Sequence, residues 1–142
     1  MASGSCASVD ELPGSASAVL AGAERGVLGT VDSQGHPHLV PVCWSSLQGL
    51  FYVPVDHKPK SSARQQRLKN LERNPEASLL LDHYEADWTQ LGWVMVRGRA
   101  RIEPVGEACA HFVARYPQYA DHPPRDEAIV LQPRRLLWWS WQ

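Results

Sequence analysis

The amino-acid sequence predicts a mainly β protein, a small antiparallel barrel flanked by helices. Short runs of β-branched and aromatic residues recur along the chain, and Gly, Pro, Ser and Asn turns separate them. Helical segments stand singly between these runs, and the connections are too short for repeated βαβ units. A length of 142 residues with 44% hydrophobic content is enough for one core. We therefore expect one domain over residues 15–142.

The elements follow in order from local composition. Residues 1–14 are small and polar, so we expect a disordered tail, and the alanine-rich stretch 16–24 is expected to form a short helix. Stronger helix formers fill residues 61–73 between Ser61 and Asn74-Pro75, and a further helix is expected over 106–115. Six strands are expected over 27–32, 38–44, 50–55, 77–84, 91–103 and 128–131.

Finer features of the strands also follow from the residues. Ser33-Gln34-Gly35 predicts a tight hairpin, and the strand over 50–55 is expected as the third of a meander. Pro41 and Pro54 lack the N–H that a strand ladder needs, so both strands should have an open edge, a bulge or a ligand there. Residues 91–103 alternate between an apolar face and one carrying Trp93, Met95 and three arginines.

Charge and cysteine usage exclude several classes of protein. The net charge of −1 does not suit a nucleic-acid binder. Three widely spaced cysteines without CxxC spacing are typical of reduced thiols in a cytoplasmic protein. No apolar run is long enough for a transmembrane helix, and the N-terminus does not resemble a signal peptide, so we expect no membrane association and no export.

A basic segment is the most informative part of the sequence. Residues 56–73 hold six of the 14 Lys and Arg, namely Lys58, Lys60, Arg64, Arg67, Lys69 and Arg73. If residues 60–69 are helical, then Lys60, Arg64 and Arg67 share one stripe while Lys69 points away. This stripe follows a strand and lies at a helix N-terminus, which favours a phosphate or carboxylate. The alternative is a solvated basic helix face.

Aromatic and histidine residues form two further sets. Six tryptophans exceed what so small a core needs, and their flat rings suit a planar ligand or a subunit interface. Adjacent Trp138 and Trp139 must face opposite ways on a strand, so at least one needs a partner surface. The histidines match no standard ligand spacing, so we expect no metal. No nucleophile motif or dinucleotide fingerprint is present, and the catalytic residues stay unassigned. Any chemistry is therefore expected to come from a cofactor.

Four successive segments resemble a known family. The order GTVDSQGHPHLVPVCW, LFYVPVDHKPK, RLKNLERNPEASLLLDHY and WVMVRGRARI is similar to the pyridoxamine-phosphate-oxidase-like superfamily, and most similar to its F420-dependent oxidoreductases of actinobacterial type. The resemblance implies an FMN-binding-like split β-barrel of six antiparallel strands. It also implies a homodimer that holds the deazaflavin coenzyme F420 between its subunits. The same fold holding FMN, and a non-catalytic cofactor carrier, remain alternatives.

The resemblance also implies positions for the cofactor. Lys58, Lys60, Arg64 and Arg67 match the residues that hold the phosphate, and Val40, Pro41 and Val42 match the strand that lines the ring. His57 and Trp93 complete the candidate cofactor-binding set, and Tyr84 or His57 could supply a proton. The expected reaction is hydride transfer from the reduced deazaflavin to a small organic acceptor.

Overall fold

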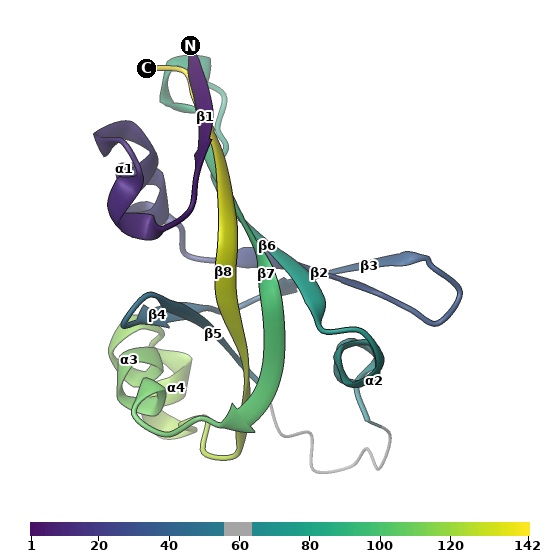
Figure 1. Cartoon of the computed structure of the whole chain (residues 1–142). Helices are drawn as coiled ribbons and strands as arrows, with labels where there is room; N and C mark the ends of the chain where they lie inside the picture. Colours follow the sequence, from purple (N-terminus) through teal and green to yellow (C-terminus); the bar gives the residue numbers. More distant parts are fainter. Residues whose placement is uncertain (56–63) are drawn as a thin grey trace.

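The computed structural model of the chain describes residues 1–55 and 64–142, and in them an eight-stranded antiparallel sheet dominates (Figure 1). The strands are β1 (Ala2–Cys6), β2 (Gly26–Val31), β3 (Pro37–Val42), β4 (Ser45–Leu47), β5 (Leu50–Pro54), β6 (Glu76–His83), β7 (Gly92–Pro104) and β8 (Glu127–Ser140). The helices are α1 (Gly14–Gly22), α2 (Gln66–Arg73), α3 (Ala108–Arg115) and α4 (Gln118–Asp121), with 3-10 turns η1 (Val9–Glu11) and η2 (Trp88–Gln90). No helix in these ranges is both long and apolar enough to cross a membrane.

The predicted fold class is confirmed, with two more strands than expected. The sheet order is β3-β2-β6-β7-β8-β5-β4, and β1 pairs with β8 outside this path. All six expected strands form, and the additional ones are β1 and the three-residue β4. The expected meander is wrong, because β5 pairs with β4 and β8 and does not pair with β3. The Gln48-Gly49 turn, with both residues at positive φ, reverses the chain from β4 into β5.

Strands β7 and β8 are the long central pair of the molecule (Figure 1). On the edge opposite β7, β8 pairs with β5 along Ala128–Leu131 and with β1 along Leu136–Ser140. Between these two segments lies a bulge, where the register against β7 shifts at Arg97/Gly98. A Cβ at Gly98 would lie 1.9 Å from the backbone oxygen of Gln132, so only glycine fits opposite the bulge.

The N-terminal residues are more ordered than their composition predicted. A disordered tail was expected over residues 1–14, but residues 2–6 form β1, which pairs with the edge of β8. Backbone pairing needs no apolar side chains, so a polar ASGSC segment can complete an open strand edge. Gly4 lies over the Trp138 ring, where an added Cβ would come within 2.8 Å of a ring carbon.

The β2–β3 hairpin projects from the sheet beside α2 (Figure 1). Gly35 at φ 83° closes its turn, and an Asp32 side-chain oxygen accepts hydrogen bonds from the amides of Gln34 and His36, both at 2.9 Å. Strand β3 is the edge of the sheet, which accommodates Pro41 as predicted. Pro54 also lies at an open edge, because β4 pairs with β5 only as far as Tyr52.

Two apolar clusters lie on opposite faces of the sheet where β5 pairs with β8, since adjacent Ala128 and Ile129 belong to different clusters. The larger one gathers inward residues of the strands with α1 and α2, and the smaller one joins Phe112 of α3 to Tyr119 of α4. The predicted alternation in β7 is confirmed, since Val94 and Val96 are buried while Arg97 and Arg99 are exposed. The outer face of β7 therefore carries no covering element from the described residues of this chain.

Candidate functional site

A small cationic cavity brings together three of the residues predicted to bind a cofactor. It measures about 260 Å³ and is lined by Arg25, Pro41, Val42, Cys43, Pro54, Arg67 and Tyr119. Two arginines and no carboxylate line this cavity among the described residues. We call it the arginine cavity. Its charge suits an anionic group such as a phosphate.

Local structure explains why these residues meet. Pro41 and Val42 end β3 at the sheet edge, and Arg25 directly precedes β2, which pairs with β3. Helix α2 buries Leu68 and Leu71 against the core, and Arg67 lies half-buried beside them. Buried Asn70 of the same helix donates a hydrogen bond of 3.0 Å to the Thr30 hydroxyl, which fixes α2 against β2. The edge of β3 and helix α2 are thus held on two sides of the arginine cavity.

The predicted cationic stripe is only partly realised. Helix α2 begins at Gln66, after Gln65 in an extended conformation, so Arg64 precedes the helix and does not share a stripe with Arg67. Arg64 instead pairs with Glu72 and with Glu127, the latter at 3.7 Å. The hydrogen bond to Glu72 raises the pKa of Arg64 above its ordinary value. Arg64 does not line the arginine cavity, so its assignment to the phosphate gains no support.

The other predicted site residues divide into three groups. His57, Lys58 and Lys60 lie outside the described residues. Val40 is half-buried and packs against the main core, so its side chain does not line the arginine cavity. Trp93 lies on the outer face of β7 and lines a different hollow. Sequence reasoning missed Arg25, although a cation two residues before the first predicted strand was a usable signal.

A larger cavity of about 980 Å³ adjoins the arginine cavity, and the two share Arg25 and Cys43 as lining residues. Its wall includes Arg115 and Tyr116 of the α3 end. The Arg115 guanidinium lies 4.3 Å from the centroid of the Trp44 ring and donates a hydrogen bond to the Ala23 carbonyl. This contact attaches α3 to the segment that carries Arg25.

The Tyr116 hydroxyl strengthens the same attachment. It accepts a hydrogen bond of 3.0 Å from the Trp44 amide and donates one of 2.5 Å to the Glu24 carbonyl. The indole of Trp44 in turn donates to the Ala23 carbonyl at 3.0 Å. The backbone is therefore fixed at Ala23 and Glu24, the two residues before Arg25.

An aromatic hollow lies on the outer face and continues the larger cavity through the shared residues Asp82 and Tyr84. Its volume is about 610 Å³, and its lining residues are Leu80, Asp82, Tyr84, Trp88, Leu91, Gly92, Trp93, Trp139 and Trp141. We call it the tryptophan pocket. The two cavities and the tryptophan pocket together connect a cationic end to an apolar aromatic end.

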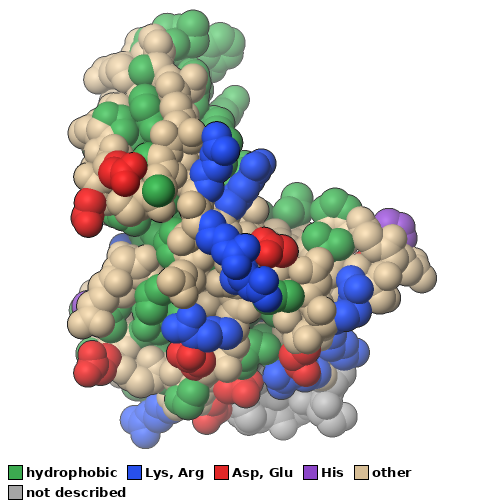
Figure 2. Space-filling view, viewed as in Figure 1, with side chains coloured by type: hydrophobic (Ala, Val, Ile, Leu, Met, Phe, Trp, Pro, Cys, Tyr) green, Lys and Arg blue, Asp and Glu red, His purple; other side chains and the backbone are tan. Residues whose placement is uncertain are grey.

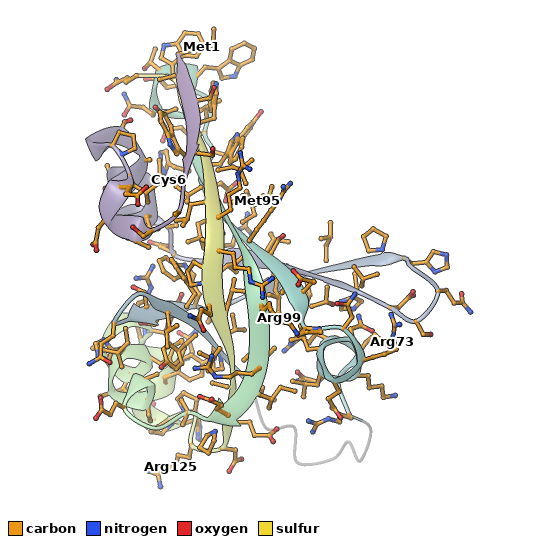
Figure 3. All side chains as sticks on the ribbon, viewed as in Figure 1. Met1, Cys6, Arg73, Met95, Arg99 and Arg125 are labelled. Atoms are coloured by element: carbon orange, nitrogen blue, oxygen red, sulfur yellow. The ribbon has the colours of Figure 1, made fainter. Side chains whose placement is uncertain are left out.

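The rest of the outer face is apolar near the tryptophan pocket and cationic farther along. One row across the sheet, aligned by strand pairing, consists of Pro41, Val27, Leu80, Met95 and Leu137. The next row includes the paired Arg97 and Arg135, and exposed Arg99 lies further along β7. Figure 2 shows a column of cationic side chains over β7 and β8, and Figure 3 places Met95 and Arg99 along β7.

The described residues around these cavities form no cluster of metal ligands and no activated nucleophile. In the ranges 1–55 and 64–142, no three His, Cys, Asp or Glu side chains gather as metal ligands do. All three cysteines are half-buried free thiols, and burial, followed by the negative charge of Glu11, raises the pKa of Cys6. A raised pKa keeps this thiol protonated and poorly nucleophilic.

The fold and its cavities define a split β-barrel protein with an anion-sized arginine cavity at the edge of the sheet. The family model of pyridoxamine 5'-phosphate oxidase matches residues 12–140. The chain therefore belongs to the pyridoxamine 5'-phosphate oxidase family. Among curated protein sequences, none matches the chain significantly.

Solved structures support the fold. Protein Atu2129 (unknown function) from Agrobacterium tumefaciens str. C58 is 20% identical with a TM-score of 0.68, over 87% of this chain and 54% of that one. The chain thus spans about half the length of that relative. The conserved hypothetical protein Rv2991 from Mycobacterium tuberculosis is 24% identical, with a TM-score of 0.68 over 88% and 82% of the two chains. HutZ, the heme storage protein from Vibrio cholerae, is 22% identical with a TM-score of 0.64, over 82% and 86%.

Proposed function

We propose that the protein is an oxidoreductase that binds the deazaflavin coenzyme F420 and transfers hydride from it to a small organic acceptor. The observation that carries this proposal is the arginine cavity, where Arg25 and Arg67 meet Pro41 and Val42 of the edge strand β3. Family membership supports a flavin-type cofactor. The choice of F420 within that class rests on the sequence resemblance.

The residues present fit such a cofactor. A phosphate needs charged donors, and the guanidinium groups of Arg25 and Arg67 supply them. A planar ring needs a flat surface with backbone hydrogen-bonding groups. Strand β3 offers both, because it is the last strand of the sheet and alternate backbone groups of residues 37–42 face away from β2.

Each part of the site has a distinct role in this proposal. The bound cofactor would supply the hydride, and the chain would supply binding and orientation. Arg67 and Arg25 anchor the anionic end, while Arg115 and Tyr116 fix the segment before Arg25. The adjoining cavity of about 980 Å³ has room for an acceptor beside the ring. Tyr84, on the boundary with the tryptophan pocket, could exchange a proton with an acceptor there.

We also propose that the protein is a homodimer. The apolar row from Pro41 to Leu137 crosses five strands on the outer face, and the described residues of the same chain do not cover it. A partly exposed apolar strip of this extent indicates an interface in a protein of this size. Light scattering at micromolar concentration should give twice the chain mass, whereas a monomer would contradict the proposal.

Titration of the purified protein with coenzyme F420, FMN and hemin tests the cofactor assignment. We expect saturable quenching of F420 fluorescence at one cofactor per chain, with weaker binding of FMN. Reduced cofactor should then be reoxidised when candidate acceptors are added under anaerobic conditions. Hemin is included because HutZ is a heme storage protein of the same fold.

Each titration result has a defined meaning. Tight FMN binding without F420 binding would move the protein to the FMN-dependent flavoproteins. F420 binding without reoxidation by any acceptor would support a non-catalytic carrier. A Soret band with hemin, in the absence of binding to either flavin, would refute the proposal altogether.

A further inference from the structure

We infer that the tryptophan pocket binds a planar aromatic ligand that carries a positive charge, and that this ligand is the hydride acceptor. The second part rests on the proposed function, and the first part does not. Three features of the pocket support the inference: its aromatic walls, its single carboxylate and its position next to the larger cavity.

Aromatic faces dominate the walls of the pocket. Trp93 and Trp139 are direct cross-strand neighbours on the outer face, and Trp141 follows at the end of β8. Leu80 and Leu91 add aliphatic surface. Flat aromatic walls of this kind favour a planar ligand, and the negative faces of indole rings attract cations.

Trp88 forms the open side of the pocket. Its side chain is 63% exposed, an unusual exposure for the largest apolar residue type. The short turn η2 holds it in place, because the Asp87 side chain caps this turn by accepting a hydrogen bond of 3.0 Å from the Thr89 amide. The exposed indole is thus presented by a capped turn that lies outside the apolar row proposed as the dimer interface, where a ligand can reach it.

Asp82 supplies the charge preference. It is the only charged residue among the described residues that line the pocket, and it pairs across the sheet with Trp93. The residue is half-buried, and in the described ranges its carboxylate has no hydrogen-bond or ion-pair partner. A carboxylate beside indole faces attracts a cation by two additive effects and repels an anion.

The position of the pocket connects it with the proposed chemistry. Asp82 and Tyr84 also line the larger cavity, which shares Arg25 with the arginine cavity. A ligand in the tryptophan pocket therefore borders the larger cavity, which the proposed function assigns to the acceptor. Cationic C=N groups, as in iminium ions and N-alkylated heteroaromatic rings, are the acceptors that this charge pattern selects. Addition of hydride to the carbon of such a group gives a neutral amine.

Binding of N-methylquinolinium tests the inference in the absence of cofactor. Tryptophan fluorescence quenching of the intact protein should show saturable binding, about tenfold tighter than for the neutral isostere 1-methylnaphthalene. Binding of 2-naphthoate should be weaker than both. Because no cofactor is present, failure of F420 binding would not affect this result. Equal affinity for the three probes, or preference for 2-naphthoate, would overturn the inference.

Two variants with matched controls locate the binding. Asp82→Asn should abolish most of the preference for the cation while binding of 1-methylnaphthalene persists, and Asp121→Asn on exposed α4 should change neither. Trp88→Ala should weaken N-methylquinolinium binding about five- to tenfold, whereas Leu39→Ala, at a residue 69% exposed on β3, should not. If Trp88→Ala instead lowers the mass in light scattering and leaves probe binding unchanged, a second copy of the chain covers the pocket and the inference is wrong.

Discussion

Replacement of Arg67 by alanine is expected to weaken cofactor binding while replacement of Lys69 leaves it unchanged. The two residues lie two positions apart on α2, so their side chains point about 200° apart around the helix axis. Arg67 is half-buried and lines the arginine cavity, whereas Lys69 is exposed. A charge-assisted hydrogen bond to phosphate contributes about 1.5–3 kcal/mol, and about 1.4 kcal/mol corresponds to a tenfold change in Kd. Arg67→Ala should therefore raise the Kd by roughly one to two orders of magnitude.

Fluorescence titration with coenzyme F420 measures this change, and thermal unfolding of the cofactor-free variants provides the folding control. Arg67 contributes charge at a cavity wall and little core volume, so its loss should move the Tm by only a few degrees. If Lys69→Ala damaged binding as much as Arg67→Ala, the assumed orientation of α2 would be incorrect. If neither variant altered the Kd, the arginine cavity would be a solvated surface and the anchoring argument would fail.

Further predictions concern the fold and its surroundings. Gly98→Ala should lower the free energy of unfolding by roughly 2–4 kcal/mol in urea titration, because the new Cβ would collide with the bulge backbone; a change near zero would contradict the need for glycine there. Tyr116→Phe should cost roughly 1–3 kcal/mol in the same assay, since the buried Trp44 amide loses its acceptor. Hydrogen bonds from the His36 amide, and next from the Gln34 amide, lower the pKa of Asp32. The ionised Asp32 side chain therefore stabilises the β2–β3 turn above the unfolded-state pKa, and this stabilisation is lost as pH falls through the lowered pKa. Amide hydrogen exchange in the turn should accelerate in that acidic range, and Asp32→Asn should abolish the pH dependence. A chelator should leave the Tm and the cofactor Kd unchanged, and stoichiometric metal in elemental analysis would contradict this.

Local sequence patterns predicted most strands because each pattern has a local physical cause. Alternation in residues 91–103 requires one buried and one exposed face, and the structure confirms it at Val94 and Arg97. The Ser33–Gly35 turn follows from residues that tolerate tight reversals. The prolines at 41 and 54 predicted an open edge, a bulge or a ligand, and the structure has an open edge at both, because proline has no N–H to donate on that side.

Pairing between distant segments could not be predicted in the same way. Polar residues 2–6 form a strand only because β8 offers an open edge more than a hundred residues later. The partner of β5 is likewise β8, and nothing local to residues 50–54 indicates it.

The candidate site shows the same division. Pro41, Val42 and Arg67 were predicted from their motifs and do meet, but the start of α2 was placed too early, so Arg64 was assigned wrongly to the helix stripe. Arg25 joins them only through the pairing of β2 with β3. Trp93 was predicted to bind the cofactor, and the structure places it on the outer face of β7, where it lines the tryptophan pocket.

The central place of β8 has a consequence for biosynthesis. This strand pairs with β7 along its length and with β5 and β1 on its other edge, yet it is translated after all of them. While the ribosome makes residues 1–126, strands β1 and β5 have no β8 to pair with, and the outer edge of β7 stays open. Exposed strand edges are sites of aggregation, and long-range pairing is slow, so the nascent chain depends on a late closing step. Ribosome stalling near residue 126 should therefore expose a protease-sensitive chain that becomes resistant once β8 is released.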